Sequence, residues 1–481
     1  METNYSWYKK VALLFGPILF LVLYNLPFTL ITPAADKVIA VAVWMIIWWI
    51  TETVSISVTA LLPLTLFPLL GIMDMSAVAA NYGSPIVFLF FGGFVMALAL
   101  EKVNLHKRIA LNIVQVTGTS PDKIILGFML ATAFLSMWIS NTATTVVMLP
   151  IALSVINLIQ QDEDGFSAQD KNFALSIMLG IAYAANVGGI ATIIGTPPNT
   201  VLVGFMESEY QVQISFLSWL KIGLPFSCMM IFIIYTLLVK FIYPSQLTQL
   251  HQSRNIIAEE LAKLGPIKAA EWRVLIIFLI TIFLWVTRVY LNELLPFLKL
   301  SDAGISVLAA FAFFTIPFNF NRGEFTLRWE DTVKLPWGIL ILFGGGLALA
   351  KGLSEAGVID YIGTIVSANE GLDSFVIGAL LILVMLFMTE LMSNVALISI
   401  FAPVVAGIAL GLDTEMLLLL IPVTMASSCA FMLPMATPPN AIVFASGYIK
   451  VHEMAKAGIW LNIISVLILI LFSAYVIPNI F

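Results

Sequence analysis

The chain has 481 residues, of which 60% are hydrophobic and 10% are charged, and its formal net charge is −6. Soluble domains carry roughly 25% charged residues, so this composition excludes an ordinary soluble protein, and its apolar content excludes a disordered chain. The negative net charge gives no reason to expect a nucleic-acid partner. We therefore predict an all-α polytopic membrane protein, in which about 20 apolar residues make each span.

The apolar segments begin close to the N-terminus. Lys9 and Lys10 precede a long apolar run with no small-residue cleavage site after it, so residues 1–35 are predicted as a retained membrane helix. A first repeat is predicted over 36–243. Its two longest runs contain polar residues and proline, and we expect a hairpin and a broken helix there, at 124–160 and 172–206.

The rest of the chain follows the same scheme. Residues 244–271 form the most polar interior stretch and are predicted as a cytoplasmic linker. The second repeat is predicted over 272–481, with a hairpin at 374–411 and a broken helix at 414–447. Residues 101–119 are compatible with either a span or a surface helix.

Four short motifs recur in the same order in the two halves and indicate a duplicated unit. They are Ile56-Ser57-Val58 and Ile305-Ser306-Val307, Phe91-Gly92-Gly93 and Phe343-Gly344-Gly345, Ser140-Asn141-Thr142 and Ser393-Asn394-Val395, and Thr196-Pro197-Pro198-Asn199 and Thr437-Pro438-Pro439-Asn440. Five spans in each repeat would turn the second repeat upside down relative to the first. Such inverted repeats are typical of secondary transporters.

The distribution of basic residues orients this arrangement. With the N-terminus inside, most of the 22 Lys and Arg residues fall on the cytoplasmic side, as expected for membrane proteins. We therefore predict a multi-pass protein of the cell membrane, with a cytoplasmic N-terminus and an external C-terminus. The distribution does not separate a hairpin from a pair of full spans, because both return to the starting side.

The Thr-Pro-Pro-Asn motifs interrupt helices. Each proline lacks an N–H and clashes with the carbonyl four residues back, so carbonyls near Ile193, Ile194, Pro434 and Met435 lose their helix partners. Free carbonyls within a bilayer are costly unless a cavity, water or an ion satisfies them. One proline would indicate a kink repaired by Ser or Thr, but two breaks at matching positions predict a binding site.

The two Ser-Asn motifs offer oxygens for a cation and N–H or O–H donors for a carboxylate. Such residues also commonly join membrane helices, but their duplication favours a site. No Arg or Lys lies in these motifs. A bound anion would therefore need the positive potential of helix N-termini or of co-bound cations. Oxygen-rich, uncharged pockets from two repeats predict two cation sites beside one anion site.

Several other residues have structural alternatives. Glu390 is either a site carboxylate or a group that holds the hairpin arms, whereas Glu52 and Arg288 are predicted near the membrane interfaces. The glycine pairs indicate close helix packing rather than a phosphate loop. An aromatic cluster is predicted as an interface belt rather than a ligand cage, and consists of Trp44, Trp48 and Trp49.

Residues 137–144 (MWISNTAT), with the two Thr-Pro-Pro-Asn copies, resemble the divalent anion/sodium symporter family, which includes INDY-type di- and tricarboxylate carriers. The resemblance extends over about 48–444. It implies a homodimer of eleven-helix protomers, each with a scaffold domain and a transport domain that moves like an elevator. The Ser-Asn motifs would lie at the tips of two re-entrant hairpins, facing the Thr-Pro breaks.

The resemblance also implies site residues. One sodium site would use Ser136, Ser140, Asn141 and Gly195, and the other Thr389, the Met392 carbonyl, Asn394 and Ala436. The substrate positions would be Asn141, Thr142, Thr196, Asn394, Val395, Thr437 and Pro438. Val395 departs from the family pattern, which usually has Thr, so one hydroxyl is lost. The sequence also departs after Thr51-Glu52, at Val54, Ser55 and Ser57, a stretch expected to lie away from the site.

We therefore predict a secondary active transporter of dicarboxylates such as succinate, malate and fumarate, with 2-oxoglutarate and citrate as further candidates. Sodium ions are the expected coupling ions, and no cofactor is expected; the expected partners are the dicarboxylate, membrane lipid and a second copy of the chain. Val395 keeps open the alternative of sodium-independent dicarboxylate exchange. A channel is disfavoured because paired broken helices suit alternating access. An enzyme is disfavoured because no nucleophile, His or metal constellation stands out.

Overall fold

The computed structural model describes residues 6–26, 31–118, 120–160, 167–245, 247, 251–369, 371 and 373–481. Within these residues nine helices are long and apolar enough to cross a membrane, which confirms a helical, polytopic membrane protein. One of the nine, Asn394–Gly411, belongs to the second predicted hairpin. The prediction of an all-α fold needs one small correction: two short antiparallel strands, β1 (Pro317–Asn319) and β2 (Glu324–Phe325), pair after α15.

The helices of the first half, including the N-terminal ones, are α1 (Trp7–Asn25), α2 (Pro33–Thr51), α3 (Ile56–Thr59), α4 (Leu62–Leu69), α5 (Met75–Tyr82), α6 (Pro85–Lys102), α7 (Leu105–Thr117), α8 (Pro121–Ser136), α9 (Asn141–Gln160), α10 (Ala168–Ile190), α11 (Pro197–Tyr210), α12 (Phe216–Thr236) and the π-helix η1 (Leu237–Ile242). Their starts follow ordinary capping chemistry. Ser167 and Asp170 form a capping box for α10, and the Thr32 hydroxyl accepts a bond from Ala35 N at the start of α2.

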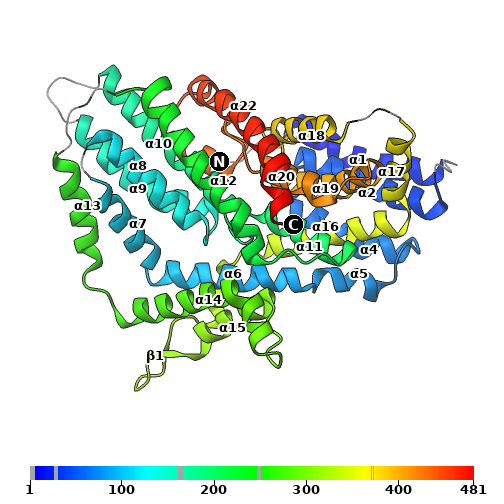
Figure 1. Cartoon of the computed structure of the whole chain (residues 1–481), viewed down its shortest axis with the longest axis horizontal. Coiled ribbons are helices and arrows are strands. Elements are labelled where there is room, and N and C mark those ends of the chain that lie inside the picture. The colour runs from blue at the N-terminus through cyan, green and yellow to red at the C-terminus, as the bar shows by residue number, and fades with distance from the viewer. Residues whose placement is uncertain are drawn as a thin grey trace.

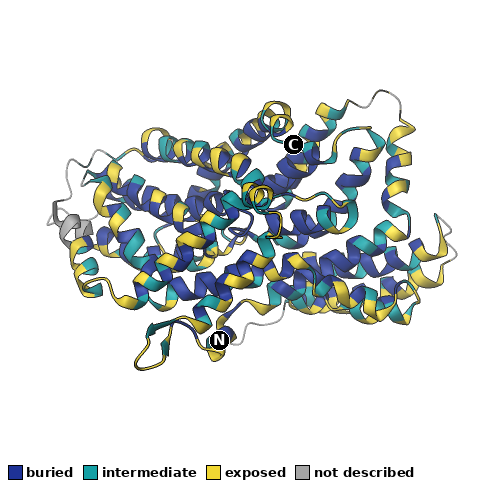
Figure 2. Ribbon diagram, turned by 60° about the horizontal axis from the view of Figure 1, so that its bottom comes forward, coloured by how far each residue is buried: buried dark blue, intermediate teal, exposed yellow. Residues whose placement is uncertain are grey.

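The second half contains α13 (His251–Leu264), α14 (Ala269–Leu294), α15 (Asp302–Thr315), η2 (Trp329–Lys334), α16 (Trp337–Glu355), α17 (Val358–Ser367), α18 (Ser374–Met388), α19 (Asn394–Gly411), α20 (Met416–Ala426), α21 (Pro438–Phe444), α22 (Val451–Tyr475) and η3 (Ile477–Asn479). Figure 1 shows α8 and α9 on one side of the molecule and α18 and α19 on the other, with α12, α20 and α22 between them. In Figure 2 the two ends of the chain lie at opposite edges.

Helix α10 lies at the centre of the core, and the span Ala168–Ile190 is completely buried in its most apolar window. The outer helix α14 is only 28% buried in its own window and exposes Leu279, Ile280 and Phe283. Figure 2 shows this contrast between a buried centre and an exposed rim. In a membrane protein such an apolar rim faces lipid, so the burial pattern agrees with a bilayer environment.

The glycine motifs bring the two halves into close contact. Gly92 of α6 lies directly against Ser306 of α15, and Gly345 of α16 lies against Ala60, where an added Cβ would overlap the neighbour. The Ser306 hydroxyl also donates a bond of 2.7 Å to the carbonyl of Leu89. The prediction of close packing through glycine is therefore confirmed.

The tryptophan cluster does not form an interface belt as a whole. Trp49 is fully buried, and its indole N–H donates to the carbonyl of Ile56 at 3.0 Å. Trp48 donates in the same way to the carbonyl of Ala12 at 3.1 Å, which joins α1 to α2. The belt prediction is wrong for Trp49, because a large indole is most stable in packed surroundings where a carbonyl satisfies its N–H.

Residues 101–119 contain α7, a helix of 13 residues that packs against α8 and α13. At about 1.5 Å per residue it is shorter than a hydrocarbon core of about 30 Å, which favours a surface helix over a span. Arg108 of α7 donates to the buried carboxylate of Glu271 and to the Gly265 carbonyl. Hydrogen bonds from Lys107 and Lys263 hold the pKa of Glu260, on α13, below its usual range. The polar segment between the halves is thus tied to α7 by charged pairs.

Candidate substrate and cation site

Two helix breaks meet at the centre of the protein. Helix α10 ends at Ile190 and α11 begins at Pro197, so the first break comprises 191–196. Helix α20 ends at Ala426 and α21 begins at Pro438, which leaves a longer second break at 427–437. In both cases a proline occupies the first position of the new helix, where its missing N–H costs nothing.

The Asn of each Thr-Pro-Pro-Asn motif stabilises its own break. Nδ2 of Asn199 donates to the carbonyl of Thr192 at 2.8 Å, and Nδ2 of Asn440 donates to the carbonyl of Leu433 at 3.1 Å. Both acceptors lie seven residues before the asparagine. Oγ1 of Thr200 satisfies the carbonyl of Ile193 at 2.7 Å, one of those expected to lose a helix partner. Side chains thus replace the lost helical bonds.

The tips of the two hairpins share a second repeated contact. Oγ of Ser136 donates to Oδ1 of Asn141 at 2.5 Å, and Oγ1 of Thr389 donates to Oδ1 of Asn394 at 2.7 Å. Both bonds span five residues across the turn between two helices. An amide oxygen has two lone pairs, so each asparagine keeps one lone pair for a cation, and its NH₂ can donate to an anion.

A cavity of about 710 Å³ joins the two breaks and the two hairpin tips. Eleven of the thirteen residues predicted for the site line this cavity, namely Ser140, Asn141, Thr142, Gly195, Thr196, Met392, Asn394, Val395, Ala436, Thr437 and Pro438. Ser136 and Thr389 are buried behind the cavity wall, where they donate hydrogen bonds to the lining residues Asn141 and Asn394. The structure therefore brings together residues that are far apart in the sequence.

An oxygen-lined hollow lies at the first break. A Cβ added to Gly189 would lie 2.6 Å from Oδ1 of Asn141 and 3.0 Å from the Gly195 carbonyl. A Cβ added to Gly195 would lie 3.0 Å from the Ser136 carbonyl. Side-chain and backbone oxygens therefore converge where glycine leaves room, and such hard oxygen ligands suit a small hard cation.

Several helix N-termini point into the same cavity. Asn141 begins α9, Pro197 begins α11 and Asn394 begins α19, and these helices have 20, 14 and 18 residues. Each N-terminus contributes roughly half a positive charge through its unpaired N–H groups. Three such ends partly offset the charge of a dianion without any Lys or Arg in the motifs.

Sequence reasoning missed several lining residues. Asn186 of α10 lines the cavity, and its Nδ2 donates to Oγ1 of Thr437 at 3.1 Å. Thr51, Glu52 and Ile56 also line it, whereas Val54, Ser55 and Ser57, which were expected to lie away from the site, are not among the lining residues. The prediction of Glu52 at a membrane interface also overlooked the cavity. Only the tertiary packing of α2 beside the motifs reveals these positions.

Glu390 is a structural carboxylate of the second break. Its two oxygens accept bonds from the backbone N–H groups of Phe431, Met432 and Leu433 at 2.8 to 3.1 Å. Asn462 of α22 adds a bond of 2.9 Å. Glu390 is 3% exposed, and these donors compensate its burial. It thus holds the break rather than the hairpin arms. Arg288, which was predicted near a membrane interface, forms an ion pair with Asp302 at 2.9 Å.

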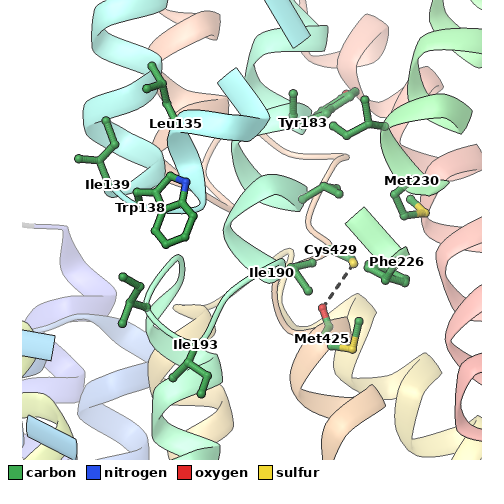
Figure 3. Close-up of a cluster of buried hydrophobic side chains, with 14 of the residues drawn as sticks. Leu135, Trp138, Ile139, Tyr183, Ile190, Ile193, Phe226, Met230, Met425 and Cys429 are labelled. Carbon is green, nitrogen blue, oxygen red and sulfur yellow. Dashed lines mark hydrogen bonds between the residues drawn. The ribbon is translucent and has the colours of Figure 1, made fainter. Parts of the chain in front are cut away.

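The core around the breaks joins the two halves. Figure 3 shows Ile190 at the end of α10 and Ile193 within the first break, with Met425 of α20 and Cys429 of the second break near Ile190. Sγ of Cys429 donates to the carbonyl of Met425 at 3.4 Å. Tyr183 of α10 donates to the carbonyl of Phe431 at 2.8 Å, so α10 supports both breaks.

Comparison with known proteins agrees with this description. The family profile described as "Sodium:sulfate symporter transmembrane region" matches residues 4–478. A "Sodium-dependent dicarboxylate transporter SdcS" of Staphylococcus saprophyticus is 39% identical over 99% of this chain and 92% of its own length. Its namesake in Staphylococcus aureus strain USA300 is also 39% identical, over 98% of this chain and 91% of its own length.

Two solved structures share the fold at low sequence identity. The Neisseria gonorrhoeae MtrF structure, described as one of a class of antimetabolite efflux pumps, has a TM-score of 0.57 and 13% identity over 83% of both chains. The Alcanivorax borkumensis YdaH transporter has a TM-score of 0.57 and 12% identity over 98% of both chains. Because the profile spans nearly the whole sequence, this chain is a multi-pass membrane transporter, not an enzyme, and belongs to the sodium:sulfate symporter family.

Proposed function

We propose that this protein carries dicarboxylates across the cell membrane by sodium-coupled symport. The cavity formed by the two Asn-tipped hairpins and the two Thr-Pro breaks is the observation that carries the proposal. Two relatives at 39% identity are named sodium-dependent dicarboxylate transporters, which supports the same substrate class. Succinate, malate and fumarate are the first candidates, with 2-oxoglutarate and citrate behind them.

In this proposal sodium ions bind at the hairpin tips. The first ion would use Ser136, Ser140, Asn141 and Gly195, where oxygens converge beside Gly189. The second would use the matching positions, Thr389, Met392, Asn394 and Ala436. Moving a dianion into a cell against an inside-negative potential costs about 2.3 kcal/mol per charge per 100 mV. Two co-transported sodium ions would cancel the charge of the dianion and remove this cost.

The substrate would lie between the two cation sites. One carboxylate would accept bonds from Asn141, Thr142 and Thr196, and the other from Asn394 and Thr437, beside Val395 and Pro438. The amide nitrogens are suited to this role because the amide oxygens already accept bonds from Ser136 and Thr389. Three helix N-termini add positive potential.

Transport would follow from movement of the hairpins and broken helices as one body within a homodimer, in an elevator mechanism. The recurrence of Ser136–Asn141 and Thr389–Asn394 bonds at one spacing supports two repeats, each of five spans and a re-entrant hairpin, related by inversion. With the N-terminus inside, the cavity, which reaches Tyr8 of α1, opens toward the cytoplasm.

Uptake of labelled succinate into proteoliposomes tests the proposal. We expect an inward sodium gradient to drive uptake into empty vesicles, and a matched potassium gradient to leave it at background. Val395, which lines the cavity without a hydroxyl, keeps open the alternative of sodium-independent exchange. Uptake only into vesicles preloaded with malate, with no response to sodium, would establish that rival instead. Failure of both would refute dicarboxylate transport.

A further inference from the structure

Among the described residues that line the central cavity two are charged, and neither belongs to the repeated motifs. They are Lys9 of α1 and Glu52 at the end of α2. The other lining residues are neutral, including every Ser, Thr and Asn of the hairpin tips. A dicarboxylate that enters or leaves by this side therefore passes one fixed cation and one fixed anion before it meets the helix N-termini.

Lys9 is held in place at this position. Its Nζ donates to the backbone carbonyl of Glu52 at 3.0 Å, and its own carbonyl accepts a bond from Oγ1 of Thr53 at 2.5 Å. Glu52 caps α2 in the left-handed conformation, with φ +46°, which non-glycine residues rarely adopt. Such a backbone persists only where the surroundings impose it, so the Lys9 contact is part of a defined local structure.

Within the described part of the chain, no carboxylate pairs with Lys9. Among the ion pairs of the described residues none includes Lys9, and its bonded partner is a carbonyl. The side chain is half-buried, whereas its neighbour Lys10 is exposed and does not line the cavity. An ammonium with no carboxylate partner, at the wall of an anion cavity, keeps attraction for the ligand.

We propose that Lys9 captures the dicarboxylate at the mouth of the cavity and that Glu52 opposes it, so that the pair sets the affinity for dianions on the N-terminal side. This inference rests on the proposed dicarboxylate function. The field of helix N-termini falls off within about one turn, so it acts at the binding position and not at the mouth. A fixed charge near the mouth acts over about a Debye length, roughly 8 Å at physiological ionic strength.

The two charges predict opposite effects on succinate binding by the purified full-length protein at one fixed, low sodium concentration with no other salt added. We expect Lys9→Gln to weaken binding about five-fold at low ionic strength and Glu52→Gln to strengthen it about two-fold. Choline chloride should reduce both differences, because salt screens exposed charges. Lys9→Arg should retain the affinity, and Lys10→Gln, one position along the same helix, should leave it unchanged.

A cysteine at position 9 allows the effect of the charge to be distinguished from the effect of losing the lysine side chain. The variant Lys9→Cys, with the exposed Cys228 replaced by serine, would be modified with a methanethiosulfonate that carries either a trimethylammonium or a sulfonate group. The cationic adduct should restore succinate affinity, and the anionic adduct should weaken it further. The Cys228→Ser protein treated with both reagents is the control.

The outcomes are distinguishable. If the unmodified protein binds no succinate, the proposed function fails and the inference falls with it. If the unmodified protein binds succinate and Lys9→Gln binds it equally well at low ionic strength, only the inference is overturned. The inference would also be overturned if Lys9→Gln lost affinity for succinate to the same extent at every salt concentration and both adducts had the same effect. That result would mean that Lys9 only stabilises the end of α2.

Discussion

Nδ2 of Asn186 donates a hydrogen bond of 3.1 Å to Oγ1 of Thr437, and this bond joins the two halves of the chain at the wall of the cavity. The same nitrogen also lies 3.1 Å from the Ala430 carbonyl and 3.3 Å from Oδ1 of Asn440. One buried amide thus holds the second break in place from the first half, and the geometry of Thr437 depends on it.

Removal of this amide should impair substrate binding. We expect Asn186→Ala to raise the KM for succinate about ten-fold, because Thr437 loses the donor that orients its hydroxyl. The buried acceptors around Asn186 also lose a hydrogen bond, at a cost of about 1 kcal/mol for each bond. Initial rates of uptake against succinate concentration measure this. Asn112→Ala is the control, because that exposed asparagine donates to the Arg108 carbonyl within α7. An unchanged KM would show that Thr437 is held without Asn186.

The hydroxyl behind the first hairpin tip should tune sodium affinity. In Ser136→Ala, Oδ1 of Asn141 loses the donor that fixes its direction, so we expect the sodium concentration for half-maximal uptake to rise about five-fold. Thr132→Ala removes another buried hydroxyl of α8, which donates to the Phe128 carbonyl within the same helix, and should have little effect. Equal sodium dependence in both variants would argue against a cation at Asn141.

The glycine at the oxygen-lined hollow should be essential for sodium coupling. Gly189→Ala would bring a methyl group within 2.6 Å of Oδ1 of Asn141, and we expect sodium-driven uptake to fall at least ten-fold. Gly180→Ala, on the same helix, would meet the flexible side chain of Met129 at 3.0 Å and Cγ2 of Ile125 at 3.8 Å. That control should keep most of its activity, and uptake that survives in Gly189→Ala would refute a cation in this hollow.

The position of Val395 offers a gain-of-function test. Val395→Thr would add a hydroxyl to the second half of the cavity, and we expect it to lower the KM for succinate several-fold, since a new hydrogen bond contributes about 1 kcal/mol. Thr142→Val makes the reverse change in the first half and should raise the KM. Opposite shifts would support a substrate that touches both halves, whereas no shift in either variant would place it elsewhere.

Much of the local structure follows from short-range chemistry in the sequence. Proline fixes where α11 and α21 begin, and the Asn two residues later bonds back to the break, so the end of each break could be predicted. The beginning of the second break could not, because α20 already ends at Ala426. Gly92 likewise predicted a close helix contact, because a missing side chain lets backbones approach. The hairpin tips followed from polar residues that recur in apolar runs.

The sequence alone determined that this is a helical membrane protein with a duplicated set of polar, broken segments, because composition and repeated motifs are properties of the chain itself. Tertiary structure decided which distant residues share the cavity. Lys9, Glu52 and Asn186 were missed, Trp49 was assigned to the wrong environment, and Glu390 remained ambiguous between two roles. The environment of each of these residues depends on contacts with residues far apart in the chain. Local sequence patterns do not encode such contacts, because side chains from distant helices pack together only once the helices have assembled.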